Sequence, residues 1–386
     1  MSKIKVAYLD YSPIFAGAER VLSTIIQNID KMRFEPILVF PYPQEHQKGY
    51  DSLSCKKFYL AGGLKWWMGS DRWKHPLRGS DFIKRTIMGC RLAYILKREN
   101  VDILHVNLLR VDALMWILPS KMMGIKVIGH FRSQDTSWIA PPSTQKVCDM
   151  ILCVSKYSRE RMLTKGTHTD SLVVYDSVNT NLFHPLDDKK KFKKKLGFNE
   201  NSFLMTSVGQ LSRHKGHDNA IRAFANIANE FPSVLLFIAG GGSPDNLAYL
   251  KSIYNDYPYL KDRVIFSEKQ LTNIKDVYAA SDLVLSLTKV GEAFGLVPYE
   301  AALVGTSFIA PNMGAVKEFV VDGENGLLVD TNDVNAIANK IKWAIEHPNE
   351  CKTMSDKIKR TIAENLTPEE MTRNLEDVYE KLYKGK

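Results

Sequence analysis

Two glutamates separated by seven residues, Glu292 and Glu300, have the types and spacing that could do chemistry in this chain. Glu292 lies in a short loop, and Glu300 lies in a helix expected from about Leu296 to Val304. The first backbone N–H groups of that helix, beside Gly295, have no intrahelical partner and suit an anion such as a diphosphate. A carboxylate about one turn further in can accept two hydrogen bonds from a ribose diol. The spacing alone is also compatible with an ordinary strand–helix–strand unit whose glutamates face solvent.

The elements that must position these glutamates can be read from the flanking sequence. The apolar segment A-A-S-D-L-V-L-S-L, residues 279–287, predicts a buried strand before the loop. Pro298 falls in the first turn of the helix, where its missing N–H is tolerated, and Gly305 is a natural helix end. A second apolar strand is expected from Ser307 to Ala310. The segment therefore predicts a strand, a loop, a helix and a strand, with one glutamate in the loop and one in the helix.

The full string from Leu287 to Glu318 resembles the E-x(7)-E block of retaining glycosyltransferases with the GT-B fold (the group 1, or family 4, glycosyltransferases). That block commonly reads E-G-F-G-L-x-x-x-E-A-M-A-x-G-x-P-V-I-A, followed by G-G-x-x-E. The matching positions are Glu292, Phe294, Gly295, Leu296, Glu300, Ala301, Gly305, Gly314 and Glu318. The departures, Ala293, Ser307 and Ala315, are not charged positions. The resemblance implies an α/β protein of two Rossmann-like domains facing across a cleft.

The resemblance extends over nearly the whole chain, and 386 residues also suggest two domains. It implies an N-terminal, acceptor-side Rossmann-like domain over residues 1–185 and a C-terminal, nucleotide-sugar-binding domain over residues 200–365. It also implies a terminal helix over residues 366–386 that crosses back to the first domain. The lysine run from Lys189 to Lys195 is expected to be a solvated linker helix.

Two more segments of the second domain resemble donor-holding loops of the family. V-G-Q-L-S-R-H-K-G resembles V-G-R-L-x-x-x-K-G, whose two cations hold the donor phosphates. Lys215 matches one cation, and Arg213 is the candidate for the other because Gln210 stands where arginine is usual. V-I-F-S-E-K-Q, residues 264–270, resembles the loop whose backbone meets the base. The implied donor-binding residues are Gly17, Gly209, Arg213, Lys215, Glu268, Lys269, Phe294, Gly295, Leu296 and Glu300.

The first domain offers two segments near the expected reaction centre. F-A-G-A-E-R, with Gly17, resembles the G-G-A-E-R loop of the family, and Ala16 replaces its first glycine. His130 lies near the end of a strand expected over residues 125–131. A lone histidine is most often a hydrogen-bonded core residue, but at this point the resemblance implies a histidine that faces the transferred sugar. The implied catalytic residues are therefore His130, Glu292 and Lys215, with no metal ligand.

The resemblance implies a retaining transferase that moves a sugar from a nucleotide-diphosphate sugar to a hydroxyl of a glycan or lipid-linked acceptor, as in cell-surface polysaccharide or glycolipid synthesis. A UDP-sugar is favoured over a GDP-sugar as donor substrate, and no cofactor is expected. Lys215 and Arg213 would stabilise the leaving diphosphate in place of a metal. The alternative, which Gln210 and Ala16 favour, is a nucleotide-sugar-binding protein without turnover.

Composition and cysteine usage point to a globular intracellular protein. Apolar residues make up 45% and charged residues 25% of the chain, as in ordinary globular domains. The five cysteines are an odd number without metal-type spacing, which favours a reducing compartment over a disulfide framework. No apolar run approaches the length of a membrane span, and the N-terminus resembles a strand rather than a signal peptide. We therefore expect a cytoplasmic protein.

The positive charge of the chain is concentrated in one segment. The formal net charge is +9, and the segment from Lys56 to Glu99 holds eleven basic and three acidic residues, an excess of +8. Trp66, Trp67 and Trp73 are interleaved with these cations, which suits an anionic membrane surface. The alternative is an ordinary helix with solvated basic residues, and nucleic acid is not an expected partner. Residues 65–84 are thus the candidate for peripheral attachment to the inner face of the plasma membrane.

Overall fold

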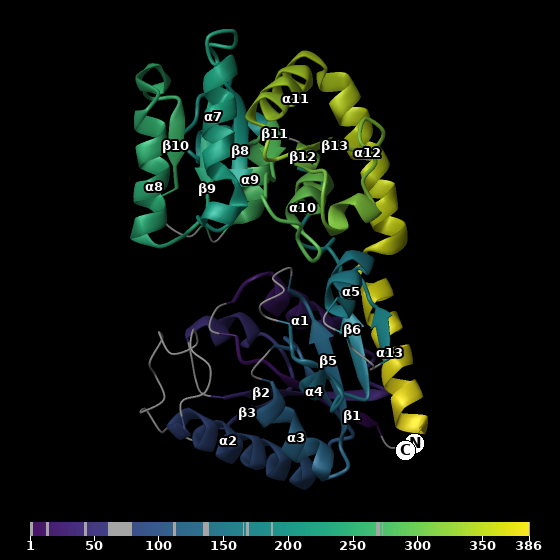
Figure 1. Cartoon of the computed structure of the whole chain (residues 1–386). Coiled ribbons are helices and arrows are strands. Elements are labelled where there is room, and N and C mark those ends of the chain that lie inside the picture. The colour runs from purple at the N-terminus through teal and green to yellow at the C-terminus, as the bar shows by residue number, and fades with distance from the viewer. Residues whose placement is uncertain are drawn as a thin grey trace. The chain divides into compact units, whose positions relative to one another are not determined.

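The computed structural model describes residues 3–12, 15–41, 45–60, 79–110, 113–133, 139–164, 166, 170–186, 188–267, 271 and 273–385. The chain divides into two compact units (Figure 1). Unit 1 comprises Met1–Ser177 and Pro368–Lys386, and unit 2 comprises Val178–Thr367. Each unit is a parallel sheet with helices packed on it, so both units are Rossmann-like α/β domains, as the sequence predicts.

Among the residues that the structure describes, the sheet of unit 1 has seven strands in the order β3-β2-β1-β4-β5-β6-β7, all paired in parallel. The strands are β1 (Ile4–Leu9), β2 (Phe34–Phe40), β3 (Lys56–Tyr59), β4 (Ile103–Val106), β5 (Lys126–Phe131), β6 (Met150–Cys153) and β7 (Ser171–Val173). Strands β2 and β3 lie on one side of β1, and strands β4 to β7 lie on its other side, so the strand order reverses between β1 and β4. Ligands of such sheets bind beyond the carboxyl ends of the strands at this switch point.

The helices of unit 1 cover the sheet with their apolar faces. They are α1 (Gly17–Asn28), α2 (Gly79–Arg98), α3 (Leu114–Met122), α4 (Pro142–Gln145), α5 (Lys156–Leu163) and α13 (Pro368–Lys384). The last helix, α13, comes from the far end of the chain and packs beside α1 (Figure 1). Its buried side chains include Leu375 and Tyr379. The expected return of the terminal helix to the first domain is therefore observed.

In the described part of unit 2, the sheet has six parallel strands in the order β10-β9-β8-β11-β12-β13. They are β8 (Phe203–Val208), β9 (Val234–Ala239), β10 (Val264–Phe266), β11 (Leu283–Leu285), β12 (Ser307–Pro311) and β13 (Leu327–Val329). The helices are α6 (Lys189–Lys195), α7 (His217–Ile227), α8 (Pro244–Asn255), α9 (Ile274–Ala280), α10 (Val297–Val304), α11 (Val334–Glu346) and α12 (Pro348–Asn365). The switch point of this sheet lies between β8 and β11.

The core of unit 2 explains why its central strands are almost continuously apolar. Strands buried on both faces cannot alternate polar and apolar residues, and β8, β11 and β12 are buried along nearly their whole length. The amphipathic α7 adds Ile221 and Phe224, both fully buried, to this core. The loops after β8 and β11 are thereby held at the carboxyl edge of a rigid sheet.

The boundary between the units lies earlier than the residue 185 expected from the sequence, because the connecting segment packs on unit 2. The backbone N–H of Leu186 donates to the carbonyl of Val304 at 3.3 Å. In α6, Lys193 is buried rather than solvated, and its ammonium lies 2.6 Å from Asp282 and donates to the carbonyl of Ser202. The segment from Val178 onward is therefore part of unit 2 rather than a free linker.

Within the described ranges, no helix combines the length and the apolar character needed to cross a membrane.

Candidate active site

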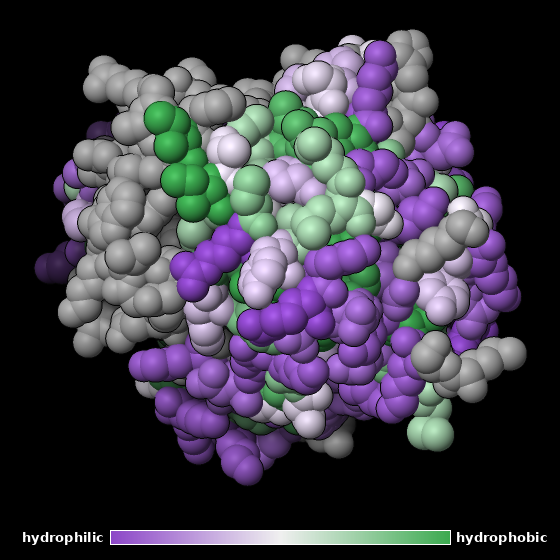
Figure 2. Space-filling model, turned by 90° about the horizontal axis from the view of Figure 1, so that it is seen from below, coloured by the Kyte–Doolittle hydropathy of each residue, from purple (hydrophilic) through white to green (hydrophobic). Residues whose placement is uncertain are grey.

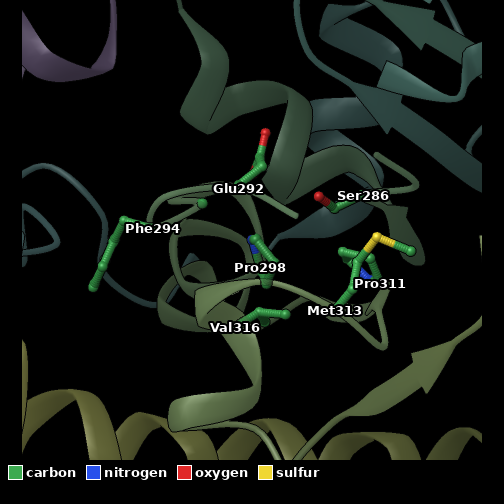
Figure 3. Close-up of a pocket in the computed structure, with 8 residues that line it drawn as sticks. Ser286, Glu292, Phe294, Pro298, Pro311, Met313 and Val316 are labelled. Carbon is green, nitrogen blue, oxygen red and sulfur yellow. The ribbon is translucent and has the colours of Figure 1, made fainter. Parts of the chain in front are cut away.

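The loop between β11 and α10 forms the centre of the candidate site in unit 2. It begins after Leu285, and α10 runs from Val297 to Val304, with Pro298 in its first turn and Gly305 at its end in the left-handed region, φ 100°. These bounds agree with the helix predicted from the sequence. A small hollow lies beside the start of α10 (Figure 3). It is lined by Ser286, Glu292, Phe294, Gly295, Pro298, Pro311, Met313 and Val316.

The hollow has a polar and an apolar side. Figure 3 shows the oxygen atoms of Glu292 and Ser286 on one side, with Pro298 and Val316 below them in this view. The first N–H groups of α10 open beside it, where an anion can replace the missing intrahelical acceptors. The arrangement suits a ligand that combines a charged group with a less polar body.

Lys215 and Glu292 meet at this site, although 77 positions separate them in the chain. The Lys215 ammonium donates to Glu292 Oε1 in an ion pair that is mostly shielded from solvent. Lys215 ends a 3₁₀ turn, Arg213–Lys215, that follows β8. Its neighbour Gly216 has φ 73°, and a Cβ there would lie 1.8 Å from the carbonyl oxygen of Leu287. Glycine at 216 therefore permits the close packing that brings Lys215 to the Glu292 loop.

Gly295 and Gly314 shape the loop around Glu292. Gly295 has φ 85°, and a Cβ there would lie 2.6 Å from Glu292 Oε2. Gly314 has φ 81°, and its Cβ would lie 2.7 Å from the backbone nitrogen of Glu292. The N–H of Ala315 donates to the carbonyl of Glu292 at 3.1 Å. Both glycines are needed for conformation and for space, which explains why the motif has glycine at these positions.

Glu300 is held in place by an aromatic hydroxyl. It is buried inside α10, and its Oε2 accepts a hydrogen bond of 2.8 Å from the hydroxyl of Tyr278 on α9. Tyr278 is itself fixed, because its carbonyl accepts from the hydroxyl of Thr306 at 2.7 Å. A carboxylate with such a donor has a defined orientation. The sequence identified Glu300 but gave no indication of Tyr278.

Phe294 contributes packing rather than an exposed ring. Its ring lies 5.6 Å from that of Tyr299 and 6.4 Å from that of Phe319, and the residue is 5% exposed. The side chain of Phe294 is therefore used in packing, and the donor contact expected of this residue stays a prediction. These ring contacts join the start of α10 to the segment that follows Glu318.

A histidine supports the loop that follows β8. Burial lowers the pKa of His217 to about 4, so its ring is neutral near pH 7. Its Nε2 donates to the carbonyl of Gln210 at 3.2 Å, and its Nδ1 accepts from the Ser207 hydroxyl at 2.8 Å. Gly209, in front of Gln210, packs against Gly240. The backbone of this loop is therefore fixed by a side chain that the sequence did not single out.

The two candidate cations of this loop have different surroundings. Whereas Lys215 pairs with Glu292, the guanidinium of Arg213 lies 4.4 Å from the ring centroid of Tyr249 on α8. The ammonium of another lysine, Lys289, pairs with the buried Asp218 at 2.6 Å. The backbone N–H of Lys289 donates to the carbonyl of His214 at 2.7 Å. Lys289 therefore ties the β11–α10 loop to the loop that carries Lys215.

His130 is the catalytic candidate in unit 1. It lies at the carboxyl end of β5 and is 1% exposed. Burial and the nearby charge of Arg132 lower its pKa well below the usual value, so the ring is neutral. Arg132 Nη2 lies 3.2 Å from His130 Nδ1, and Arg132 also pairs with the buried Asp176. An arginine only donates hydrogen bonds, so Nδ1 accepts and the single ring proton is on Nε2. In the described part of unit 1, that Nε2 has no partner.

Two more buried polar side chains lie at the same edge of the unit 1 sheet. Asn107 follows β4 and is 0% exposed, and its side-chain amide has no partner among the described residues. Asp10 follows β1; burial, with a smaller contribution from Glu19, raises its pKa to about 7. Tyr50 donates to Asp10 at 2.6 Å. Neither Asn107 nor Asp10 carried a motif in the sequence, but their places at the ends of neighbouring strands could have identified them.

Gly17 is the first residue of α1, and its position depends on a cap. The side chain of Glu19 accepts from the backbone N–H of Ala16 at 2.8 Å. The loop expected to approach the donor is therefore also a helix N-terminus. Glu268 and Lys269, two of the expected donor-binding residues, lie outside the described residues, as do Trp66, Trp67 and Trp73.

The expected site residues fall into two groups. Gly209, Arg213, Lys215, Phe294, Gly295, Leu296 and Glu300, with Glu292, belong to unit 2, and a direct contact joins Lys215 to Glu292. His130 and Gly17 belong to unit 1. Each group lies at the carboxyl edge of its own sheet, close to the switch point.

Known proteins similar to this chain include several sugar transferases. A family model described as "Glycosyl transferases group 1" matches residues 188–361. N-acetyl-alpha-D-glucosaminyl L-malate synthase of Bacillus anthracis is 25% identical over 308 residues, 76% of this chain and 78% of that protein. The lipopolysaccharide core biosynthesis mannosyltransferase LpsB of Rhizobium meliloti is 28% identical over 215 residues. This last alignment covers 54% of this chain and 60% of that protein, less than two thirds of its length.

The fold is shared with solved structures. Anabaena HepE, solved in complex with UDP and glucose, has a TM-score of 0.78 to this chain and 20% sequence identity. The comparison covers 98% of this chain and 100% of that one. At this identity the likeness concerns the fold alone. The two Rossmann-like units described above are thus those of the GT-B fold.

Proposed function

We propose that this protein is a retaining glycosyltransferase whose donor is a nucleotide-diphosphate sugar, because residues 188–361 match the family model of the glycosyl transferases group 1. Unit 2 would bind the nucleotide and the diphosphate, and unit 1 would supply His130 and the acceptor side. The contact between Lys215 and Glu292, in the loop that leads into α10, carries the proposal, since it brings a cation and the motif glutamate together at the helix start expected to bind the diphosphate. The name of the Bacillus relative supports transfer of a sugar, and the UDP complex of HepE supports a UDP-sugar rather than a GDP-sugar as the proposed donor.

The proposed reaction is a front-face displacement. The bond from the anomeric carbon to the diphosphate oxygen breaks, and the acceptor oxygen attacks that carbon from the same face. The proton of the acceptor hydroxyl passes to the departing diphosphate. Lys215 and the α10 N–H groups stabilise the negative charge that develops on the diphosphate, and no metal takes part. His130 is neutral and donates its Nε2–H to an oxygen of the sugar, so it orients the donor rather than removing a proton.

The alternative function, nucleotide-sugar binding without turnover, makes a different prediction. A binding protein would retain donor affinity but would release no nucleoside diphosphate when an acceptor is added. A panel of nucleotides and nucleotide sugars, screened by thermal shift, first identifies the ligand, and turnover is then measured with that donor. A donor that shifts the unfolding temperature but is never consumed, with sugar and lipid acceptors supplied, would favour the binding protein.

Glu300→Gln is expected to lower the affinity for the nucleotide by roughly tenfold. The substitution preserves the shape but weakens charge-assisted hydrogen bonds to the ribose, each worth on the order of 1.5–3 kcal/mol. One decade of affinity is about 1.4 kcal/mol. Calorimetry with the nucleoside diphosphate measures the effect directly.

Two control variants make the Glu300 prediction specific. Glu350→Gln changes a glutamate in the first turn of another helix, α12, where the side chain is exposed, and should leave affinity unchanged. Tyr278→Phe removes the hydroxyl that orients Glu300 and should cause a smaller loss than Glu300→Gln. Equal affinity of wild type and Glu300→Gln would refute the assignment of Glu300 to the ribose.

The proposed acceptor is a glycan or a lipid-linked sugar, and the surface of unit 1 supports the lipid-linked kind. Helices α2 and α3 pack against each other and expose several large apolar side chains. These are Ile83, Ile87 and Tyr94 on α2 and Leu118 and Met122 on α3. Figure 2, seen from the side of these helices, shows hydrophobic side chains gathered on this face. The positive excess between Lys56 and Glu99 belongs to the same region of the sequence.

An anionic membrane is the proposed partner of this surface. Cations near anionic lipid gain about 1 kcal/mol each, and salt screens the attraction. The wild-type chain is expected to sediment with anionic liposomes at low salt and less at high salt. Ile87→Ser with Met122→Ser should weaken sedimentation, as should Trp66→Ala with Trp67→Ala, whereas Met32→Ser, on an exposed turn after α1, should not. Wild-type protein that stays in the supernatant at low salt would refute membrane binding and favour a soluble acceptor.

A further inference from the structure

We propose that Tyr379 and His105 are positioning residues that, together with Arg132, hold the His130 ring in one orientation with its proton on Nε2. The proposal builds on the proposed role of His130 and extends it to the C-terminal helix. It gives α13 a part in the chemistry as well as in the packing of unit 1. Nothing in the sequence motifs singled out either residue.

Four buried side chains, Tyr8, Tyr379, His105 and His130, form a continuous series of polar contacts, which we call the relay. The hydroxyl of Tyr8 lies 3.2 Å from that of Tyr379, and the Tyr379 hydroxyl lies 2.7 Å from His105 Nδ1. His105 Nε2 in turn lies 3.1 Å from His130 Nδ1. Tyr8, Tyr379 and His105 have no exposed surface, and His130 has 1%. Water therefore cannot substitute for a missing donor or acceptor without disturbing the packing.

The position of Arg132 determines which atom is the donor in each hydrogen bond between His130, His105 and Tyr379. Arg132 Nη2, 3.2 Å from His130 Nδ1, can only donate, so His130 Nδ1 is an acceptor. His105 must then donate from its Nε2. Burial, with a smaller contribution from Arg132, lowers the pKa of His105 to about 3, so its ring is neutral and its Nδ1 is an acceptor. The Tyr379 hydroxyl has one proton and two neighbours that can accept it, the Tyr8 oxygen at 3.2 Å and His105 Nδ1 at 2.7 Å. Because His105 Nδ1 is an acceptor, that proton must go to His105.

The consequence is a single tautomer at the end of the relay. With two donors on Nδ1, His130 carries its only proton on Nε2, the ring nitrogen without a partner in the described residues. The ring is presented as a hydrogen-bond donor to an oxygen of the ligand. If Tyr379 could not donate, His105 could move its proton to Nδ1 and present a bare Nε2 to His130. His130 would then be left with one donor, Arg132, and a less defined orientation.

Nuclear magnetic resonance can determine the tautomers of His105 and His130 without any enzymatic assay. In protein labelled with ¹⁵N at histidine, the ring shifts of His105 and His130 should both show the tautomer with the proton on Nε2. In Tyr379→Phe the shifts of His105 should move toward the other tautomer, because its acceptor has lost the donor. In Tyr8→Phe they should stay as in wild type, because Tyr379 still donates. Shifts of His105 that are unchanged in Tyr379→Phe would overturn the proposal.

Kinetics test whether the relay matters for the reaction. Tyr379→Phe should lower kcat by about tenfold, roughly the effect of one misdirected hydrogen bond, with little change in the donor KM. Tyr8→Phe removes a hydroxyl that is equally buried but lies one step further from His130, so it serves as the matched control. A merely structural role would give the two variants similar kcat values, and that result would overturn the proposal.

A second pair of variants covers the case in which Tyr379→Phe does not fold. Glutamine at 105 can still donate to His130 Nδ1 from its amide, whereas leucine cannot. His105→Gln should therefore keep most of the kcat that His105→Leu loses, at similar thermal stability. Equal loss in both would contradict the positioning role. A wild-type chain without transfer activity would remove the proposed function, but the ¹⁵N shifts would still decide whether the relay exists.

Discussion

Replacing Lys215 by alanine is expected to lower turnover by about a hundredfold or more when the substrates are saturating. Lys215 is ion-paired with Glu292, which lies in the loop that leads into α10. Removing one preorganised electrostatic contact to a charge that develops in the transition state costs roughly 10²–10³ in rate. The effect should appear mainly in kcat, because the charge on the diphosphate grows as the glycosidic bond breaks. Steady-state release of the nucleoside diphosphate measures it.

Lys340→Ala is the matched control for this prediction. Lys340 is also an ion-paired lysine, 3.0 Å from Asp322, and its side chain is 26% exposed, against 23% for Lys215. Its replacement removes a similar charge from unit 2 but leaves the Glu292 loop intact, so turnover should stay near the wild-type value. A Lys215→Ala variant with near-normal turnover would show that another cation carries the role. Arg213→Ala would then be the variant expected to fail.

Replacing Gly295 by alanine is expected to reduce turnover by roughly a hundredfold while the protein remains folded. The new Cβ would lie 2.6 Å from Glu292 Oε2, so the carboxylate has to move and its contact with Lys215 changes. A displacement of about 1 Å near the reaction centre can cost about 10²-fold in rate. The backbone cost of alanine at φ 85° is about 1–2 kcal/mol. Kinetics and thermal unfolding of the same preparation separate the two effects.

Gly305→Ala separates backbone strain from the displacement of Glu292. Gly305 ends the same helix, α10, with φ 100°, and the atom nearest to its added Cβ is Lys359 Nζ at 4.0 Å. This variant should lose a similar amount of stability but keep its turnover. If Gly305→Ala and Gly295→Ala lose turnover to the same extent, the loss comes from strain in α10 and the proposed placement of Glu292 is wrong.

The sequence predicted the helices and strands whose ends or apolar patterns are marked by residues close together in the chain. The strand, loop and helix around Glu292 were predicted closely because Pro298 and Gly305 mark the two ends of α10. The parallel sheets were predictable from apolar runs that alternate with helical patterns. The family resemblance supplied the two-domain arrangement and named the glutamates and Lys215. These features depend on residues that lie near one another in the sequence.

The supporting contacts could not be predicted, because they join distant parts of the chain. Tyr278 orients Glu300 across 22 positions, and Tyr379 reaches His105 across 274. Lys193 lies in a run of lysines, and only the presence of Asp282 and of the Ser202 carbonyl beside it explains why it is buried. Asn107 belongs to no motif and becomes a candidate only because β4 ends at the switch point of the sheet. Such partners are set by topology rather than by local pattern.

The release of nucleoside diphosphate by the pure chain tests the central claim most directly. The protein is incubated with the nucleotide sugar that binds best and with sugar or lipid-linked acceptors, and ³¹P resonance follows the diphosphate while ¹H resonance gives the anomeric configuration of the product. We expect release that depends on the acceptor, a product with the configuration of the donor sugar, and loss of the reaction in Lys215→Ala. Release no faster from the wild type than from Lys215→Ala, or a product with inverted configuration, would contradict the account.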